Sequence, residues 1–194
     1  DVLIVGSGAA GLATAVTAAW HGLKVIVVEK DPVLGGATAW SGGWAWVPCN
    51  PLARRAGIVE EVELPRTYLK HELGDRYDPA MIDAFLEAAP RMVAFFEQHT
   101  SLQFADGNAI ADIHGDTPGA GTGGRSVIAA PYDARNVGKL LKRLRKTMRE
   151  TAFMGMPIMA GADLTAFLNL ARSLSAAWHV TRRFTRHLFD LAVH

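Results

Sequence analysis

The chain has 194 residues, enough for one ordinary domain or for a domain with the beginning of a second, and 49% of them are hydrophobic, which is typical of a globular protein. Twenty lysines and arginines stand against 19 aspartates and glutamates, so the overall charge gives no reason to expect nucleic acid or an anionic membrane as a partner. The single cysteine, Cys49, has no cysteine or histidine nearby at zinc-ligand spacing, which predicts an inert buried thiol, no metal site and a cytoplasmic location. No apolar run approaches the roughly 20 residues that span a bilayer, so no integral membrane segment is expected.

Residues 1–46 have the pattern of a strand, a glycine turn, a helix, a second strand and a second glycine-rich loop. Residues 2–5 and 25–28 are apolar throughout, as expected for parallel strands that are covered on both faces. The alanine-rich residues 9–20 predict a crossover helix between them, which we expect to end at His21-Gly22. The fold class is therefore α/β, with a Rossmann-like βαβ unit and a parallel sheet.

The residues after Pro48 are mainly helical in pattern. Apolar residues at helical spacing predict a helix over 79–98, in which Pro90 is expected to cause a kink or a restart. The glycine-rich residues 106–124 predict a long loop. Two further amphipathic helices are expected over 135–149 and 174–193. Their basic outer faces are either solvated or a docking surface for an acidic partner or a membrane.

The G-x-G-x-x-G motif that follows the first strand and opens the first helix carries the clearest chemical signal. Gly6 permits the sharp turn, Gly8 lets the backbone approach a diphosphate, and Gly11 lets the helix lie close to the strand. The first N–H groups of the helix, around Ala9 and Ala10, then favour an anion. The motif predicts a dinucleotide site; the alternative is a set of glycines that serves only the turn.

Glu29 ends the second strand, 18 residues after Gly11, and Lys30 follows it. A carboxylate at this position can accept hydrogen bonds from both hydroxyls of an adenosine ribose, and it disfavours a 2′-phosphate, which argues against NADP. A glycine turn without a bound nucleotide would leave Glu29 unexplained.

The second glycine-rich loop, residues 35–43, favours FAD over NAD. An NAD domain usually goes directly into its next helix and strand, whereas this loop can run beneath the pyrophosphate and along the edge of an isoalloxazine ring. Thr38 and Ser41 offer hydroxyls, and the N–H groups of Gly42 and Gly43 can reach the N5/O4 edge of the flavin. The other candidate contacts of this loop are Gly36 and Ala37. The alternative is a flexible linker.

These residues resemble the FAD-dependent dehydrogenases related to fumarate reductase, the succinate dehydrogenase flavoprotein and the 3-ketosteroid dehydrogenases. The likeness is specific in residues 1–11, in Glu29-Lys30 and in residues 35–51, where the tryptophan, proline, asparagine and proline of residues 46–51 are most similar to the ketosteroid branch. The resemblance implies a flavin-dependent oxidoreductase that transfers a hydride between flavin N5 and a carbon–carbon bond next to a carbonyl. It implies a ketosteroid-like or dicarboxylate-like small-molecule substrate, while the electron acceptor stays unknown. The FAD would be non-covalent, because residues 35–43 contain no histidine.

The resemblance also implies a domain organisation. It predicts the amino-terminal part of an FAD-binding domain over 1–106 and the start of a cap or substrate domain over 107–194, in a chain that is incomplete and inactive as an enzyme. The catalytic residues are then expected after residue 194. His114 lies where steroid-oxidising relatives carry a tyrosine, so steroid activity is not inherited directly, and this histidine is either a proton carrier or a solvated loop residue.

The competing function is an NAD-binding module without flavin chemistry, which would purify as a colourless protein. The tryptophans add one further expectation. Trp40, Trp44 and Trp46 cluster beside the second glycine-rich loop and are candidates for the wall of a flavin or substrate pocket. Trp20 and Trp178 are at least as well suited to ordinary core packing.

Overall fold

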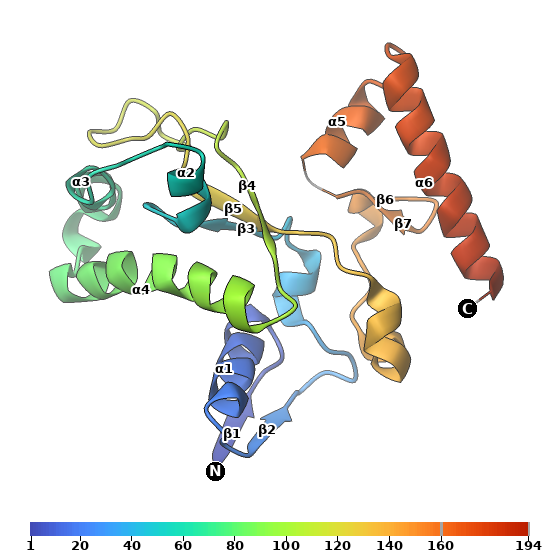
Figure 1. Ribbon diagram of the computed structural model, residues 1–194, viewed down its shortest axis with the longest axis horizontal. Helices are drawn as coiled ribbons and strands as arrows, with labels where there is room; N and C mark the ends of the chain where they lie inside the picture. Colours follow the sequence, from blue (N-terminus) through green and yellow to red (C-terminus); the bar gives the residue numbers. More distant parts are fainter. Residues whose placement is uncertain (160, 194) are drawn as a thin grey trace. The chain divides into compact units, whose positions relative to one another are not determined.

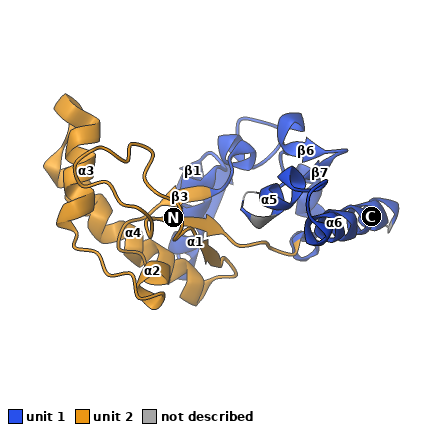
Figure 2. Ribbon diagram, turned by 90° about the horizontal axis from the view of Figure 1, so that it is seen from above, with its two compact units in different colours: residues 1–43, 134–194 blue, residues 44–133 orange. Residues whose placement is uncertain are grey.

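The computed structural model describes residues 1–159 and 161–193. The chain divides into two compact units, which Figure 2 distinguishes by colour. Unit 1 joins Asp1–Gly43 to Ala134–His194, and unit 2 is the continuous stretch Trp44–Asp133. The domain boundary expected near residue 107 stays a prediction.

Unit 1 begins with the predicted βαβ unit (Figure 1). β1 (Val2–Val5) and β2 (Val25–Val28) pair in parallel along all four residues, and α1 (Ala9–Trp20) connects them. The helix ends at His21 and Gly22 as expected, with Gly22 at a φ of 83°. Glycine adopts this left-handed conformation without steric cost, which explains the sharp end of the helix. The α/β class is confirmed.

Only one face of this two-stranded sheet is covered by the described residues. Ile4 is buried and faces α1, where Gly11 lies close to it. Because side chains alternate along a strand, Leu3, Val5 and Ile26 point the other way, and they are 66%, 81% and 66% exposed. α1 covers one face of the two strands, and the expected cover on the other face stays a prediction.

The segment after the second unit does not form the helix expected over 135–149. It forms 3-10 turns over Ala134–Arg143, and Gly138, with a φ of 60°, interrupts them. Glycine disfavours a helix interior, and here the backbone pairs elsewhere: Leu34 N donates to Arg143 O at 2.7 Å, and Arg145 N donates to Leu34 O at 2.8 Å. The apolar spacing was compatible with a helix, but these long-range hydrogen bonds replaced it. The neighbouring short elements of unit 1 are η1 (Gly36–Trp40), η3 (Ala134–Arg143), η4 (Arg149–Thr151), β6 (Ala152–Phe153) and β7 (Met156–Pro157).

Unit 1 ends in a helical hairpin. α5 (Ala162–Leu168) lies alongside α6 (Leu174–Val193), as Figure 1 shows, and the helix expected over 174–193 is confirmed. Ala166, Ala176 and Val180 are buried between the two helices. The small side chains at two of these positions allow the helix backbones to come close. Among the helices of the described residues, none combines the length and the apolar character that crossing a membrane requires.

A buried carboxylate ties the hairpin together. Asp163 is 5% exposed and accepts hydrogen bonds from Met159 N at 3.0 Å, from His179 Nε2 at 2.7 Å and from Arg183 at 2.5 Å. Burial raises the pKa of Asp163, but these hydrogen bonds and the charges of Arg183 and His179 outweigh it and lower the pKa overall. The pair of helices is therefore held by one ionised group as well as by apolar packing.

Unit 2 is built on an antiparallel sheet with the strand order β3-β5-β4. The strands are β3 (Trp44–Trp46), β4 (Phe104–Asp106) and β5 (Ser126–Ala129). They come from distant parts of the sequence, so this sheet forms only when the chain folds back on itself. The helical elements of unit 2 are α2 (Pro51–Arg55), α3 (Glu63–Leu73), η2 (Gly74–Arg76) and α4 (Pro79–His99).

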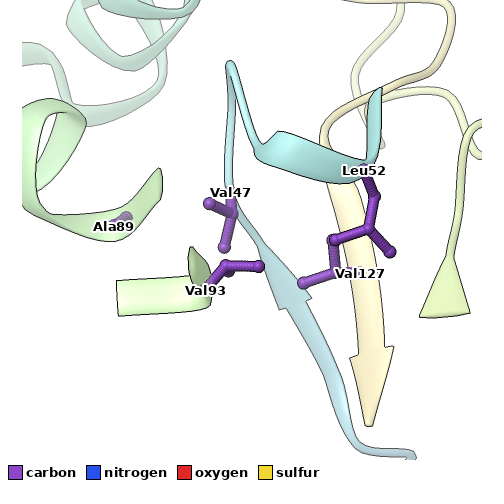
Figure 3. Packing of buried hydrophobic residues seen from close by; sticks show 5 residues of the cluster. All are labelled: Val47, Leu52, Ala89, Val93 and Val127. Carbon is purple, nitrogen blue, oxygen red and sulfur yellow. The ribbon is translucent and has the colours of Figure 1, made fainter. Parts of the chain in front are cut away.

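The core of unit 2 lies between this sheet and α4 (Figure 3). Val127 comes from β5 and Val93 from α4, and both are fully buried. Val47 and Leu52, which follow β3, and Ala89 of α4 complete the cluster. Complete burial of a valine side chain stabilises a fold by roughly 1.5–3 kcal/mol, so this small cluster is a main source of stability in unit 2.

The helix predicted over 79–98 is confirmed as α4, which begins at Pro79 and ends at His99. Asp78 caps it: Oδ1 accepts hydrogen bonds from Ala80 N at 3.0 Å and Met81 N at 3.2 Å. The helix is continuous through Pro90, so of the expected kink or restart the restart is wrong. Proline removes one backbone hydrogen bond from the helix. The packing of the buried face of α4 offsets this loss; its residues are Ile82, Leu86, Ala89, Val93 and Phe96.

The long loop over residues 106–124 is confirmed, and a buried arginine anchors its end. Arg125 is 1% exposed; it donates to Asp112 Oδ2 at 2.5 Å and, through Nε, to Glu60 Oε1 at 2.8 Å. Its guanidinium also lies 5.8 Å from the ring centre of Trp46 and 5.9 Å from that of Tyr68. A planar guanidinium group can hydrogen-bond to carboxylates and stack on aromatic rings at the same time, which a lysine ammonium group does less well. Arg125 therefore has a structural role at the end of this loop.

Asn50 has a similar role at the start of α2. It is fully buried, and its amide nitrogen donates to Val47 O at 2.8 Å and to Gly124 O at 2.9 Å. Its side-chain oxygen accepts from Ala53 N at 2.9 Å and so caps the helix. One side chain thus joins the loop after β3 to the loop before β5.

Candidate cofactor site

The glycine turn between β1 and α1 has the geometry that the motif predicts. Gly6 has a φ of 98°, and its N–H donates to Val28 O at 2.7 Å. A Cβ atom at Gly11 would lie 2.1 Å from Gly6 O, which no real structure tolerates. Both positions therefore require glycine: the first for its backbone conformation, the second for the close approach of helix and turn.

The first turn of α1 presents backbone donors, and Thr38 Oγ1 accepts from one of them, Ala9 N. Gly8 is the N-cap residue and makes no side-chain capping bond, and the first turn has no acidic residue. The N–H groups of Gly8, Ala9, Ala10 and Gly11 have no acceptor inside the helix, because the first four donors of any α-helix lack one. Together with the helix dipole, they form a site for a negatively charged group.

Glu29 lies at the tip of β2 with its carboxylate turned toward the glycine turn. Oε2 accepts hydrogen bonds from Ser7 Oγ at 2.5 Å and from Ser7 N at 2.9 Å, and Oε1 accepts from Asp31 N at 3.1 Å. The hydroxyl of Ser7, followed by these backbone N–H groups, lowers the pKa of Glu29 to about 2. The carboxylate is therefore ionised and oriented by groups of the turn and of the residues that follow it.

The second glycine-rich loop packs directly against the first. Gly35 N donates to Ser7 Oγ at 2.9 Å, and Ala9 N donates to Thr38 Oγ1 at 3.0 Å. A Cβ atom at Gly36 would lie 3.5 Å from the Cα atom of Gly8. The structure therefore brings together three segments that the sequence separates: the first turn, the end of β2 and the loop that begins at Gly35.

The remaining candidates of the second loop and of β2 are exposed. Ala37 lies within η1, and Lys30 follows Glu29 on the surface. The Ser41 hydroxyl donates to Thr38 O at 2.9 Å and accepts from Gly43 N at 3.2 Å, so it closes the end of η1. Gly42 is exposed beside it. The expected contacts of these residues with a flavin ring stay predictions.

Sequence reasoning missed Ser7. It is 1% exposed, and its hydroxyl donates to Glu29 while accepting from Gly35 N, so it is the shared partner of all three segments. The available signal was a serine, rather than an alanine or a larger residue, inside the glycine motif and 22 residues before a carboxylate.

Arg145 was missed as well, and no sequence signal pointed to it. Its guanidinium lies 4.6 Å from the ring centre of Trp40 and forms an ion pair with Asp31, while Trp40 Nε1 donates to Lys146 O at 3.1 Å. These contacts hold the second glycine-rich loop from the outside. They join residues more than 100 positions apart, which is why only the folded chain reveals them.

Two other candidates from the sequence lie in unit 2. His114 is on the surface, where Nδ1 lies 2.6 Å from Glu72 Oε2, and hydrogen bonds from His114 and Thr117 lower the pKa of Glu72. This agrees with a solvated loop histidine. Cys49 is half-buried, and burial followed by the negative charge of Glu60 raises the pKa of its thiol, as expected for an unreactive cysteine.

The tryptophans divide into two groups. Trp46 stacks on Phe85 with ring centres 6.2 Å apart and donates to Asp112, so it is part of the packing of unit 2. Trp20 and Trp178 are 51% and 70% exposed, so the expectation of core packing is wrong for both. The Trp20 ring makes an edge-to-face contact with His21, with ring centres 4.9 Å apart. The pocket-wall role of the tryptophans at positions 40, 44 and 46 stays a prediction.

Comparison with known proteins assigns the chain to a family. Residues 1–191 match a family model described as an FAD binding domain. The chain belongs to this family. FAD, not NAD, is therefore the cofactor, and the preference drawn from the second glycine-rich loop is confirmed. The resemblance to FAD-dependent dehydrogenases is confirmed as well.

Several relatives of this FAD-binding domain are named as dehydrogenases. The chain is 39% identical over 193 residues to the 4-oxocyclohex-2-ene-1-carboxylate 5-dehydrogenase of Sinomonas cyclohexanicum, covering 99% of this chain and 32% of the relative. It is 43% identical over 138 residues to the 3-oxosteroid 1-dehydrogenase of Mycobacterium tuberculosis. This match covers 71% of this chain and 24% of the relative. The crystal structure of 3-ketosteroid delta1-dehydrogenase from Sterolibacterium denitrificans superposes with a TM-score of 0.84 at 32% identity. The superposition covers 99% of this chain and 34% of the crystallised chain. The chain thus spans about a third of the length of the relatives that it matches along 99% of its own length.

The residues of this FAD-binding domain fit the cofactor of its family. The glycines themselves add no side chain at the turn, as close approach of a diphosphate requires, and the side chain that reaches the first turn of α1 is that of Thr38, whose hydroxyl accepts from Ala9 N. Glu29 is ionised, and an ionised carboxylate is an acceptor that suits a ribose hydroxyl. The second loop lies against Gly8, so it borders the same place.

Proposed function

We propose that this chain is the cofactor-binding part of a flavin-dependent oxidoreductase that acts on carbon–carbon bonds next to a carbonyl group. One observation carries the proposal: the glycine turn, the carboxylate of Glu29 and the second glycine-rich loop meet at the N-terminus of α1, with Ser7 bonded to both of the others. A turn that served only the βαβ connection would need neither the carboxylate nor the second loop.

The proposed site holds FAD without a covalent bond. The diphosphate lies at the first turn of α1, where the residues in contact are Gly6, Gly8, Ala9, Ala10 and Gly11. Glu29 accepts a hydrogen bond from the adenosine ribose, and Lys30 lies beside it. The second loop borders the flavin through Gly36, Ala37, Thr38, Ser41, Gly42 and Gly43. When bound, FAD supplies the redox chemistry, the uptake or release of a hydride at a substrate carbon.

In the proposed function, the residues of this chain bind FAD and hold the groups that contact it in place. Hydrogen bonds from Ser7 and Asp31 keep Glu29 ionised at every physiological pH and fix its direction before the nucleotide arrives. The dipole of α1 attracts the diphosphate charges. Thr38 fixes the second loop to Ala9 through a hydrogen bond of 3.0 Å, so the two loops border one place. Such preorganisation lowers the entropy that binding must lose.

A ring ketone is the proposed class of substrate. The relatives at 39% and 43% identity act, by their names, on a 4-oxocyclohexene carboxylate and on 3-oxosteroids. Both compounds carry a ketone in a six-membered carbon ring with a neighbouring CH–CH bond. A steroid-like or smaller cyclic ketone is therefore the best supported substrate, ahead of the open-chain dicarboxylates.

The cofactor part of the proposal is tested by replacing Gly8. The residue has a φ of −72°, and an added Cβ would make only an ordinary contact of 3.5 Å with Thr38 Oγ1, so Gly8→Ala is compatible with the fold. The methyl group would nevertheless stand where the diphosphate approaches. The full-length protein is expected to purify yellow, and Gly8→Ala is expected to keep its circular dichroism but lose most of its FAD, measured by absorbance after denaturation.

The matched control is Gly115→Ala. Gly115 has no atom within 4 Å of an added Cβ and lies in unit 2, so this variant is expected to retain FAD fully. If Gly8→Ala held FAD as tightly as the unaltered protein, the glycine turn would not be the diphosphate site.

The reaction class is tested separately, with the FAD-loaded full-length protein under anaerobic conditions. Addition of a 3-ketosteroid or of 4-oxocyclohexanecarboxylate is expected to bleach the oxidised flavin band. Succinate, and fumarate added to the reduced protein, serve as the dicarboxylate comparison. A yellow protein that responds to none of these compounds would refute the reaction class while leaving the cofactor site intact.

A further inference from the structure

The charge of the chain is strongly segregated, although the total is only +1. Residues 134–189 contain eleven lysines and arginines and only two acidic residues, Glu150 and Asp163. Asp163 is buried and already bonded to His179 and Arg183. The remainder of the chain is correspondingly acidic. Such asymmetry between parts of one chain points to an anionic partner for the basic part.

The same segment exposes large apolar side chains at the closed end of the α5–α6 hairpin. Leu168 is 73% exposed at the end of α5, and Leu170 is 43% exposed in the connection. Leu174 and Trp178, in the first turns of α6, are 91% and 70% exposed. Single exposed apolar residues are common, but four of them within eleven residues form a patch that calls for a partner.

The patch continues along α6 as a stripe on the side away from α5. The spacing of three and four residues places on one face Leu174, Trp178, Thr181, Thr185, Leu188 and Phe189. Ala176 and Val180, which pack on α5, lie on the opposite face. Arg182 and Arg186 are exposed and flank the stripe. No acidic residue occurs between Asp163 and Asp190.

We propose that the α5–α6 hairpin docks on the surface of a membrane that contains anionic lipids. An amphipathic helix with leucine and tryptophan on one side and arginines at its border lies in the plane of the lipid headgroups. The tryptophan at the border of the stripe suits this interface, since its ring is apolar and its N–H polar. α6 is not apolar enough to cross the bilayer, so the hairpin lies on it.

The charges and the apolar patch together favour a membrane with anionic lipids over a second copy of the chain or a nucleic acid. A second copy of the chain would bring the exposed Arg182 and Arg186 of two hairpins together, which like-charge repulsion opposes. Nucleic acid would satisfy the arginines but would leave the leucines and Trp178 in water. Anionic lipid satisfies both, because headgroups meet the arginines and acyl chains meet the apolar side chains.

The test uses the FAD-loaded full-length protein and flotation with vesicles. It is expected to float with vesicles of equal parts phosphatidylcholine and phosphatidylglycerol, and not with phosphatidylcholine alone. Raising the ionic strength from about 0.1 M to 1 M shortens the screening length from about 10 Å to about 3 Å and is expected to weaken binding. Binding is also expected to shift the fluorescence of Trp178 to the blue, a shift that Trp178→Phe removes while vesicle binding persists.

Paired variants locate the surface. Leu174→Ser combined with Trp178→Ser is expected to weaken vesicle affinity at least about tenfold, and Arg182→Gln about fivefold. All three positions are exposed, so the fold has no reason to change. Ile113→Ser is the matched control: Ile113 is 92% exposed but lies in unit 2, and its replacement is expected to leave binding unchanged.

Several results would overturn the proposal. Absence of flotation with either kind of vesicle would do so, as would equal flotation with both, because the charge argument would then fail. An equal loss of binding in Ile113→Ser would show that the hairpin is not the contact. A dimer that dissociates in the Leu174 and Trp178 double variant without lipid would assign the patch to a second copy of the chain.

Discussion

Replacing Arg125 by alanine is expected to destabilise the protein by about 3–5 kcal/mol, because it leaves a buried negative charge without its partner. The side chains of Arg125 and Asp112 are 1% and 3% exposed, and that of Glu60 is 15% exposed. Asp112 retains hydrogen bonds from Trp46 and from Gly121 N, so part of its solvation is preserved. The loss also includes the contacts of the guanidinium with the Trp46 ring.

The assay is thermal unfolding followed by circular dichroism, at equal FAD occupancy for all variants. For a protein of this size each kcal/mol lowers the midpoint by about 2–4 °C, so a fall on the order of 10 °C is expected. Arg91→Ala is the matched control, since its ion pair with Glu87 has both side chains about three-quarters exposed. An exposed pair contributes only about 0.2–1 kcal/mol.

The reasoning is refuted if Arg125→Ala unfolds at the same temperature as Arg91→Ala. A second variant separates the charge from the packing. Arg125→Met combined with Asp112→Asn removes both charges of the buried pair while keeping most of the volume, and it is expected to be more stable than Arg125→Met alone. If the double variant were the less stable of the two, the uncompensated carboxylate would not be the cause of the loss.

Three further predictions concern unit 1. Ser7→Ala removes a donor to Glu29 and an acceptor for Gly35 N, so it is expected to raise the pKa of Glu29 and to weaken FAD binding about tenfold, measured by fluorescence titration; unchanged affinity would exclude Ser7 as an organising residue. Gly11→Ala forces a Cβ against Gly6 O and is expected to cost about 1–3 kcal/mol in urea unfolding together with loss of FAD, and full retention of both would contradict the turn geometry. The folded pKa of Asp163 is lowered, so its stabilising effect is complete above about pH 4 and is lost as the pH falls below that value. The difference in urea midpoint between the unaltered protein and Asp163→Asn is therefore expected to shrink in acid, and a constant difference would show that the ionised form is not what stabilises the hairpin.

The sequence by itself determined the local units and the identity of the cofactor site. The positions of Gly6, Gly8, Gly11 and Glu29 predict the βαβ turn. Each glycine stands where the sharp turn, the approach of a diphosphate or the close packing of helix and strand disfavours a side chain, and Glu29 follows a recognisable strand. The helices over 79–98 and 174–193 were predictable for the same reason, because their apolar spacing recurs over five turns. Where backbone geometry is decided by neighbours in sequence, the pattern is sufficient.

Only the tertiary structure decided which distant segments meet. The helix expected over 135–149 is absent because Leu34 pairs with the backbone of that segment, and the role of Arg145 follows from the same contact. Arg125 and Asn50 join loops more than 60 residues apart, and their spacing in the sequence gives no sign of it. Such contacts depend on loop closure and on the burial of polar groups, which no short window of sequence records.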